Sequence, residues 1–346
     1  MPADNVTITE DIAGVLSDYL RRQNPSRVAV LVDENTREHC LPLIKQVLPA
    51  QHTVIEIKSG EVHKNLDTCR QIWVQLTEEH FDRKALMINL GGGVIGDMGG
   101  FCAATYKRGI PFVNVPTTLL SQVDASVGGK LGIDFRGYKN HIGLFQEPNM
   151  VLIDAAFLQT LPERELRSGF AEIIKHALIY DSIYWNKLRG TSLVQQDWPK
   201  HIDHSVQVKS RVVEQDFREG GLRKILNFGH TVGHAVESYF LESDTPLLHG
   251  EAIAIGMIAE AHLSVKHCDL PPEEAEEIED FILAIFGQPK IPKETLDDIV
   301  QLAKQDKKND QTAIRCTLLK SIGSARYDVP VNGTDIREAL EYYQTL

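Results

Sequence analysis

Histidines and a carboxylate with the spacing of metal ligands lie in the second half of the chain. His230 and His234 are four residues apart in a helical pattern and so share one helix face. His249 follows in the segment LHGE, and upstream Glu172 and Lys175 are one helical turn apart in an apolar stretch. Two imidazoles and a carboxylate can hold a divalent metal and leave a position open for a substrate oxygen. Spacing alone favours His230 and His234 as the imidazole pair, although a chain with 13 histidines also produces such pairs by chance.

A glycine-rich turn in the first half has the composition of a diphosphate-binding site. The run LGGGVIGD, residues 90–97, follows a strand pattern and precedes a helix pattern. Glycines let the backbone approach a diphosphate, and a helix N-terminus offers free N–H groups. An ordinary strand-to-helix turn is the alternative, since the spacing is not that of the GxGxxG fingerprint. Polar segments at 59–64 and 116–119 also follow strand patterns, which favours a cofactor cleft along one edge of a sheet.

Several cations lie in apolar or glycine-rich surroundings. They are Arg108, Lys130, Lys175, Lys209, Arg223, Lys307 and Lys308. Each alone is typical of a solvated surface charge, but Lys130 and Lys175 have small or apolar neighbours. Cations beside a metal suit a small substrate that carries phosphate and carboxylate. The formal net charge of −12 disfavours a nucleic-acid partner, because an acidic chain repels a phosphate backbone.

The elements that must position these residues differ between the two halves of the chain. In the first half, helical periodicity, as at 65–78, separates short apolar, β-branched runs. That alternation predicts an α/β dinucleotide-binding domain with a mostly parallel sheet. The predicted strands are Val28–Val32, Thr53–Ile57, Ala85–Leu90, Phe112–Val115 and Val151–Ile153.

From Pro162 onward, long amphipathic patterns predict a mainly α-helical domain. Strand patterns in this half are confined to Arg315–Leu319 and Ala325–Val329. We therefore expect a dinucleotide-binding domain at 1–155 and a metal- and substrate-binding domain at 156–346. The predicted helices are Arg164–Ile179, His201–Glu214, Leu222–Tyr239, Glu251–Lys266 and Pro272–Phe286.

Composition fits a globular cytoplasmic protein. A length of 346 residues suits two cores, and 42% hydrophobic with 24% charged residues argues against disorder. Five scattered cysteines without a CxxC pair fit reduced thiols. The N-terminal segment lacks the apolar core of a signal peptide, and no apolar run reaches the roughly 20 residues of a membrane helix. We therefore expect no membrane partner.

The assembled motifs resemble the 3-dehydroquinate synthase family, within the sugar phosphate cyclase superfamily. Several long motifs occur in the family's order, from about residue 59 to about residue 308. They are GGGVIGDMGGF (91–101), PTTLLSQVDASVGGK (116–130), LPERELRSGFAEIIK (161–175), GLRKILNFGHTVGHAVE (221–237), LHGEA (248–252) and DKK (306–308).

The resemblance implies a lyase of the shikimate pathway of aromatic amino acid biosynthesis. Its substrate would be 3-deoxy-D-arabino-heptulosonate 7-phosphate, and its products 3-dehydroquinate and phosphate. The implied steps are transient oxidation by NAD, elimination of phosphate, reduction and intramolecular aldol closure. The implied cofactors are NAD and a zinc ion, which cobalt can replace because it suits similar ligands. We also expect a homodimer.

The resemblance also implies a role for each matched residue. The metal ligands would be Glu172, His230 and His249, so that His234 moves from the metal to the substrate as a candidate proton shuttle. NAD would contact Glu61, Lys64, Gly92, Gly93, Val94, Asp97, Thr117, Thr118, Lys130, Lys139 and Thr160. The substrate would contact Arg108, Asp124, Lys130, Asn140, Lys175, Lys209, Arg223, Asn227, His234 and one of Lys307 and Lys308.

Two departures from the family pattern bear on the site. Ala125 stands where the family often has serine, which removes one potential hydrogen bond near the cofactor. The stretch 243–248 is longer than in many relatives, which could shift His249.

Three alternatives remain at this point. Another cyclase, such as 2-epi-5-epi-valiolone synthase, accepts a seven-carbon sugar phosphate without the carboxylate, and Lys209, Arg223, Asn227, His234 and the DKK run disfavour it. A metal-dependent alcohol dehydrogenase of the glycerol dehydrogenase type would release NADH, and the many cations argue against it. A catalytically dead dinucleotide-binding protein would show gaps at the catalytic positions, and all of them are filled here.

Overall fold

The computed structural model describes residues 5–136, 138–241, 243–304 and 313–346. It divides into two compact units. Unit 1 holds Met1–Leu166 and Trp198–Arg211, and unit 2 holds Arg167–Asp197 and Val212–Leu346. The domain boundary near residue 155 stays a prediction.

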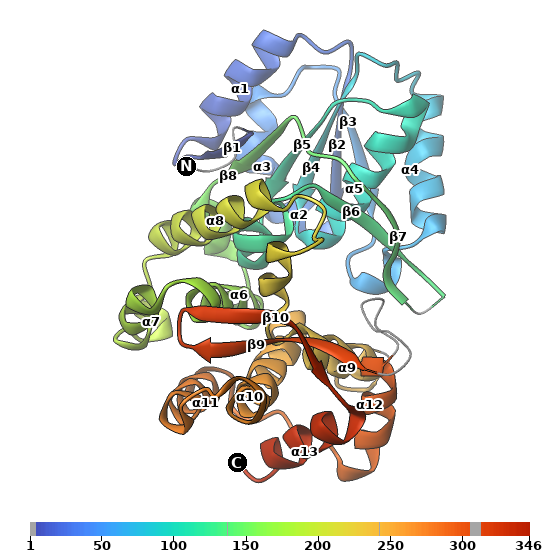
Figure 1. Cartoon of the computed structure of the whole chain (residues 1–346). Coiled ribbons are helices and arrows are strands. Elements are labelled where there is room, and N and C mark those ends of the chain that lie inside the picture. Colours follow the sequence, from blue (N-terminus) through green and yellow to red (C-terminus); the bar gives the residue numbers. More distant parts are fainter. Residues whose placement is uncertain (1–4, 137, 242, 305–312) are drawn as a thin grey trace. The chain divides into compact units, whose positions relative to one another are not determined.

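A six-stranded sheet forms the centre of unit 1 (Figure 1). Every neighbouring pair is parallel, which confirms the predicted α/β fold class. Buried parallel strands are apolar on both faces, which is why the sequence showed continuous apolar runs for them. All five predicted strands are present, each within one residue of its predicted ends; the three-residue strand β1 was not predicted. In sheet order the strands are β1 (Val6–Ile8), β8 (Met150–Ile153), β5 (Phe112–Pro116), β4 (Leu86–Gly91), β2 (Val28–Asp33) and β3 (Thr53–Ile57).

Helices cover both faces of this sheet. Along β2, Val30 packs in one core cluster with residues of α1 and α3, whereas Leu31 packs in another with residues of α4 and α5. Successive side chains of a strand point to opposite faces, so these clusters are the two sides of the sheet. The helices that contribute to these clusters are α1 (Ile12–Gln23), α3 (Leu41–Ile44), α4 (Leu66–Glu78) and α5 (Gly93–Thr105). Unit 1 also holds α2 (Glu34–His39) and most of α8 (Trp198–Gln215).

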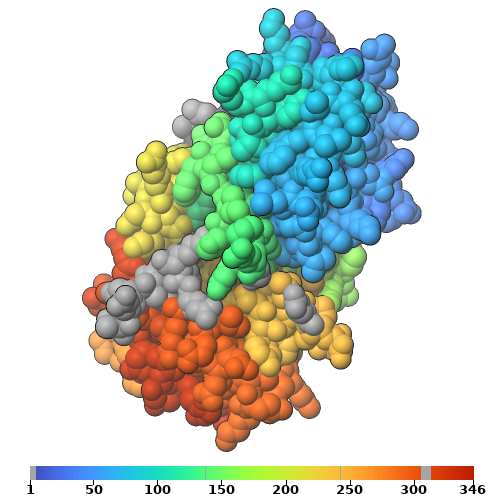
Figure 2. Space-filling model, turned by 90° about the vertical axis from the view of Figure 1, so that its right-hand side faces the viewer, coloured from blue at the N-terminus to red at the C-terminus, as the bar shows by residue number. Residues whose placement is uncertain are grey.

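An antiparallel hairpin, absent from the sequence prediction, packs on α5. It consists of β6 (Lys130–Phe135) and β7 (Tyr138–Phe145). Leu131 and Ile133 are buried in the same cluster as Phe101 of α5, while much of β7 is exposed. In Figure 2 the green hairpin runs along the surface beside the blue segments of unit 1. The exposed strand has no continuous apolar run, and the sequence pattern therefore did not reveal it.

Unit 2 is mainly helical, as predicted, with one antiparallel pair of strands. The described part of the chain contains no helix of sufficient length and apolarity to span a membrane. The elements are α6 (Glu163–Tyr180), which begins at the end of unit 1, α7 (Ser182–Arg189), α9 (His230–Phe240), α10 (His249–Cys268), α11 (Pro272–Phe286), α12 (Leu296–Lys304), β9 (Ile314–Ser321), β10 (Ser324–Val331) and α13 (Gly333–Tyr343).

The single helix predicted for Leu222–Tyr239 is wrong. A 3-10 helix spans Leu222–Asn227, and α9 begins at His230 after a break at Gly229, whose φ is 76°. The break allows a close crossing with α10, because a Cβ atom at Gly256 would lie 1.9 Å from the Gly229 carbonyl oxygen. This contact between residues far apart in the sequence breaks the helix that the local periodicity of residues 222–239 predicted.

Candidate metal and nucleotide sites

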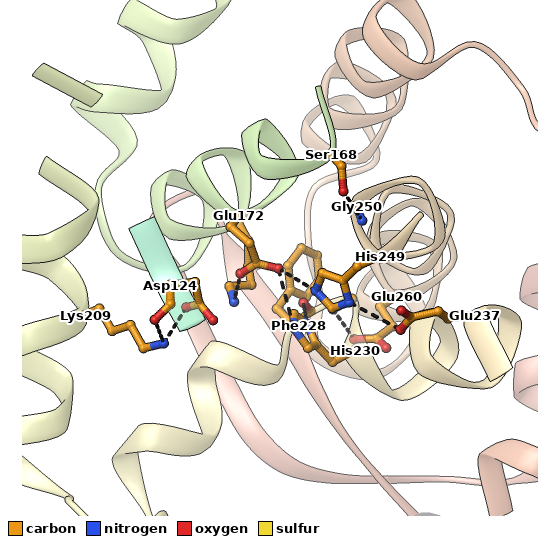
Figure 3. Close-up of polar contacts among 12 residues, drawn as sticks. Asp124, Ser168, Glu172, Lys209, Phe228, His230, Glu237, His249, Gly250 and Glu260 are labelled. Atoms are coloured by element: carbon orange, nitrogen blue, oxygen red, sulfur yellow. Dashed lines mark hydrogen bonds and ion pairs between the residues drawn. The ribbon is translucent and has the colours of Figure 1, made fainter. Parts of the chain in front are cut away.

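Three helices of unit 2 bring Glu172, His230 and His249 together (Figure 3). The Nε2 atoms of His230 and His249 lie 3.6 and 3.3 Å from the same Glu172 oxygen. One donor atom from each residue lies within 4.8 Å of the others. Glu172 is fully buried, and Lys175 contacts its carboxylate from the next turn of α6. The set that the resemblance implied, with a residue from each of three helices, is thus a spatial cluster.

Neighbouring acceptors orient both imidazole rings. The Nδ1 atom of His230 is 3.0 Å from the Phe228 carbonyl oxygen, and that of His249 is 3.3 Å from a Glu237 oxygen. When a ring is neutral and carries its proton on Nδ1, its Nε2 lone pair faces Glu172 and is available to a metal. A second-sphere acceptor of this kind fixes the tautomer and orientation of a metal-binding histidine.

A close approach of α6 and α10 fixes the carboxylate relative to His249. The Ser168 hydroxyl accepts a hydrogen bond from the Gly250 N–H at 2.9 Å. Ser168 lies one helical turn before Glu172, and Gly250 directly follows His249. The longer stretch before His249 therefore does not carry this imidazole out of reach of Glu172.

The surroundings of the cluster shift the pKa values of the two imidazoles in opposite directions. Burial, together with the Lys175 cation, holds the pKa of His230 well below its usual value. Burial also opposes protonation of His249, but the carboxylates of Glu237 and Glu172 outweigh it and raise that pKa to about 10. Two imidazole nitrogens and one carboxylate oxygen are a donor set that suits Zn²⁺ or Co²⁺. The cluster therefore fits the implied metal.

The other predicted site residues of unit 2 lie on the same or adjacent elements. His234 is one turn along α9, with ring centroids 4.9 Å from His230 and 5.8 Å from His249. It also forms, with Glu237 and His249, a second group of potential ligands. Arg223 is buried and donates to the Phe217 carbonyl oxygen at 2.6 Å.

Asn227, another predicted substrate residue of unit 2, ends the 3-10 helix that carries Arg223. Its amide donates to Glu219 at 2.6 Å. Lys307 and Lys308 lie outside the described residues.

In unit 1, predicted nucleotide and substrate residues form one network around the buried Lys64. Lys64 Nζ donates to Asp97 and to the Asn140 side chain, both at 2.7 Å, and lies 3.7 Å from Glu61. Lys139 Nζ is 3.6 Å from the same Glu61 oxygen. Burial disfavours the charge on Lys64, but Asp97 and Glu61 outweigh it and raise its pKa, so the ammonium persists.

The glycine-rich turn precedes α5 as predicted. Gly92 is the N-cap residue, and no side chain caps this helix. Gly93 and Val94 form its first turn, and Thr117 and Thr118 follow the neighbouring strand β5. N–H groups without a side-chain cap at the end of a parallel strand suit a diphosphate. The turn and the Lys64 network therefore fit a dinucleotide.

Another predicted pair meets within unit 1. Lys209 of α8 is buried, and its Nζ lies 2.8 Å from an Asp124 oxygen (Figure 3). The remaining predicted site residues of unit 1 lie at separate, exposed positions. Arg108 ends the turn after α5, Lys130 begins β6, and Thr160 ends a 3-10 helix before α6.

Sequence reasoning missed two acidic residues that contact these sites. Glu237, on the His249 imidazole, lies three residues after His234, so helical spacing was an available signal. Asp134 accepts from the Asn140 N–H at 2.7 Å, and its own N–H donates to the Lys64 carbonyl oxygen at 2.8 Å. No local signal identified Asp134, because its contacts depend on the hairpin.

Solved structures with this fold define the class. A 2-epi-5-epi-valiolone synthase from Streptomyces hygroscopicus subsp. jinggangensis 5008, with NAD⁺ and Zn²⁺ bound, has a TM-score of 0.87 and 26% identity, covering 100% of this chain and 98% of that chain. A 2-deoxy-scyllo-inosose synthase complexed with carbaglucose-6-phosphate, NAD⁺ and Co²⁺ has a TM-score of 0.85 and 24% identity, covering 97% and 96%. The fold is that of the sugar phosphate cyclases.

Sequence comparison gives the family. Residues 54–168 match the model of the 3-dehydroquinate synthase N-terminal region, and residues 169–309 match that of its C-terminal region. The 3-dehydroquinate synthase of Parabacteroides distasonis is 40% identical, covering 99% of both chains. That of Sulfurovum sp. (strain NBC37-1) is 41% identical, covering 92% of this chain and 91% of the relative. The chain belongs to the 3-dehydroquinate synthase family.

Proposed function

We propose that this chain converts 3-deoxy-D-arabino-heptulosonate 7-phosphate into 3-dehydroquinate and phosphate, a step of the shikimate pathway. The observation that carries the proposal is the cluster of the buried Glu172 with His230 and His249, in a chain 40% identical to a 3-dehydroquinate synthase over 99% of its length. When bound, the metal supplies a Lewis acid and NAD a hydride acceptor.

The residues of unit 2 would bind the metal and part of the substrate. Glu172, His230 and His249 would hold the metal, with the carboxylate and the two imidazoles as donor groups. Lys175 neutralises the buried Glu172 charge and offers its cation to the phosphate, together with Lys130 and Arg108. His234, next to both imidazoles, is the candidate proton shuttle, because an imidazole nitrogen can accept and return a proton.

The residues of unit 1 would bind the dinucleotide. The first turn of α5 receives the diphosphate, while Lys64, held by Asp97, orients the cofactor with Glu61 and Lys139. Arg223 of unit 2 and Lys209 of unit 1 would orient the substrate carboxylate or its hydroxyls. The buried ammonium of Lys209 is supported by its ion pair with Asp124.

A phosphate-release assay tests the proposal. Purified protein is incubated with NAD and Zn²⁺ or Co²⁺, and with either the heptulosonate phosphate or a seven-carbon sugar phosphate that lacks the carboxylate. Release from the first substrate, lost on omission of NAD or addition of a chelator, is the expected result. Release from the second alone would favour a 2-epi-5-epi-valiolone synthase activity. No release from either would contradict both.

We further propose a homodimer in the cytoplasm. The cytoplasmic location is supported by free cysteines at all five cysteine positions, four of them buried. The dimer rests on the family resemblance, and light scattering of the purified protein measures its mass directly.

A further inference from the structure

Glu260 is a fully buried carboxylate of α10 that lies outside the predicted sites. Its two oxygens accept hydrogen bonds from the backbone of another helix, at 2.6 Å from the Gly229 nitrogen and 3.0 Å from the Val232 nitrogen. Both donors belong to the start of α9, on either side of His230. Figure 3 shows Glu260 beside His230 and His249.

This contact replaces a local helix cap. The first N–H groups of a helix have no partner within it, and usually a side chain at the N-cap position accepts one of them. The N-cap of α9 is Gly229, which has no side chain to offer. Glu260 accepts from the N-cap N–H and from the third helical N–H, the two donors that a local capping box satisfies. An acceptor group at this end of α9 also suits the positive end of the helix dipole.

The crossing of the two helices makes this reach possible. Gly256 lies one turn before Glu260, and a Cβ atom there would be 1.9 Å from the Gly229 carbonyl oxygen. A Cβ atom at Gly233 would likewise be 3.0 Å from the Ala252 carbonyl oxygen. The backbones therefore touch, and a glutamate side chain of α10 spans the remaining gap.

We propose that Glu260 is a positioning residue for the metal site. Helix α10 supplies His249 at its first position and, through Glu260, holds the backbone that carries His230. The carboxylate thus fixes the separation of two ligands that come from different helices. This inference rests on the proposed metal-binding role of Glu172, His230 and His249.

The test is metal affinity in Glu260→Gln. The glutamine keeps one acceptor oxygen and turns an N–H donor toward a backbone N–H, so half of the cap is lost. Metal-free full-length protein is titrated with Co²⁺ by visible absorption and with Zn²⁺ against a chelator. We expect the metal dissociation constant to rise about 10- to 100-fold, the range seen for outer-sphere partners of metal ligands. The Co²⁺ bands should shift, and the NAD dissociation constant should stay unchanged.

Ser264→Ala is the matched control, because Ser264 is an equally buried polar residue of the same helix. Its hydroxyl donates to the Glu260 backbone carbonyl within the helix at 2.6 Å and accepts from the Leu319 N–H of β9 at 2.9 Å, so it does not contact the Glu260 carboxylate. We expect this variant to lose thermal stability and keep wild-type metal affinity. A third variant, Glu260→Asp, retains a carboxylate with a shorter reach and should have an intermediate metal dissociation constant. It provides the test if the glutamine variant does not fold.

Wild-type metal affinity and Co²⁺ bands in the folded Glu260 variants would overturn the inference. Equal weakening in Ser264→Ala would overturn it too, since the effect would then be general destabilisation. If the wild type binds metal but releases no phosphate, the proposed function fails while this inference is still tested. If the wild type binds neither Co²⁺ nor Zn²⁺, the inference fails with the metal site.

Discussion

Replacing Lys64 by methionine tests whether the Lys64 network of unit 1 supports both the fold and the dinucleotide site. The substitution keeps a long apolar side chain and removes the ammonium that bonds Asp97 and Asn140 at 2.7 Å. Removing one member of a buried ion pair costs about 3–5 kcal/mol, because the other charge is left without compensation. The Asp97 side chain retains 19% exposure, so we expect the lower end, about 3 kcal/mol.

Urea unfolding by circular dichroism measures this loss, and calorimetry measures NAD binding, which we expect to weaken. Asp97→Asn in the Lys64→Met background should restore much of the stability, since it removes the uncompensated charge. Lys266→Met is the matched control, because Lys266 also bonds two carboxylates but its side chain is 52% exposed. We expect that variant to lose much less stability than Lys64→Met, because a solvent-exposed ion pair is screened and contributes little. Equal losses in the two lysine variants, or an additive double variant, would refute the reasoning.

The other predictions concern the metal and acid stability. Glu172→Gln should lower bound metal, measured by elemental analysis, and phosphate release together; wild-type values for both would contradict the ligand assignment. Chelation should lower the melting temperature, and free metal at about 100 times its dissociation constant should add about 2.7 kcal/mol; an unchanged melting curve would contradict this. Burial opposes ionisation of Asp335, but Lys266 and the Asn332 N–H outweigh it and lower its pKa. Its stabilisation is therefore present above the ordinary pKa of about 3.8 and is lost as pH falls, so acid unfolding of Asp335→Asn should depend less on pH than that of the wild type.

The sequence predicted elements whose signal is local. Strand β4 is buried along its whole length, so it appears as an apolar run, and α11 begins at Pro272, a residue that favours the first turn of a helix. The hairpin β6–β7 escaped prediction because its outer strand is mostly exposed. The break at Gly229 escaped because its cause, Gly256, is remote in the sequence.

In the candidate site, too, contacts within one helix could be predicted from the sequence, and contacts between distant segments could not. Spacing could pair His230 with His234, which share a helix, but it could not select His249, which α10 brings to Glu172. The resemblance to a family supplied that choice. Glu260 acts across two helices, and neither spacing nor the resemblance indicated it.

The glycine crossing of α9 and α10 limits how this sequence can change. A methyl group at residue 256 would overlap the carbonyl oxygen of Gly229 unless the helices moved apart. Such a movement would also separate the histidines that the two helices carry. In a saturation mutagenesis library selected for growth without aromatic amino acids, position 256 should accept glycine alone, even though glycine offers no functional group to the reaction.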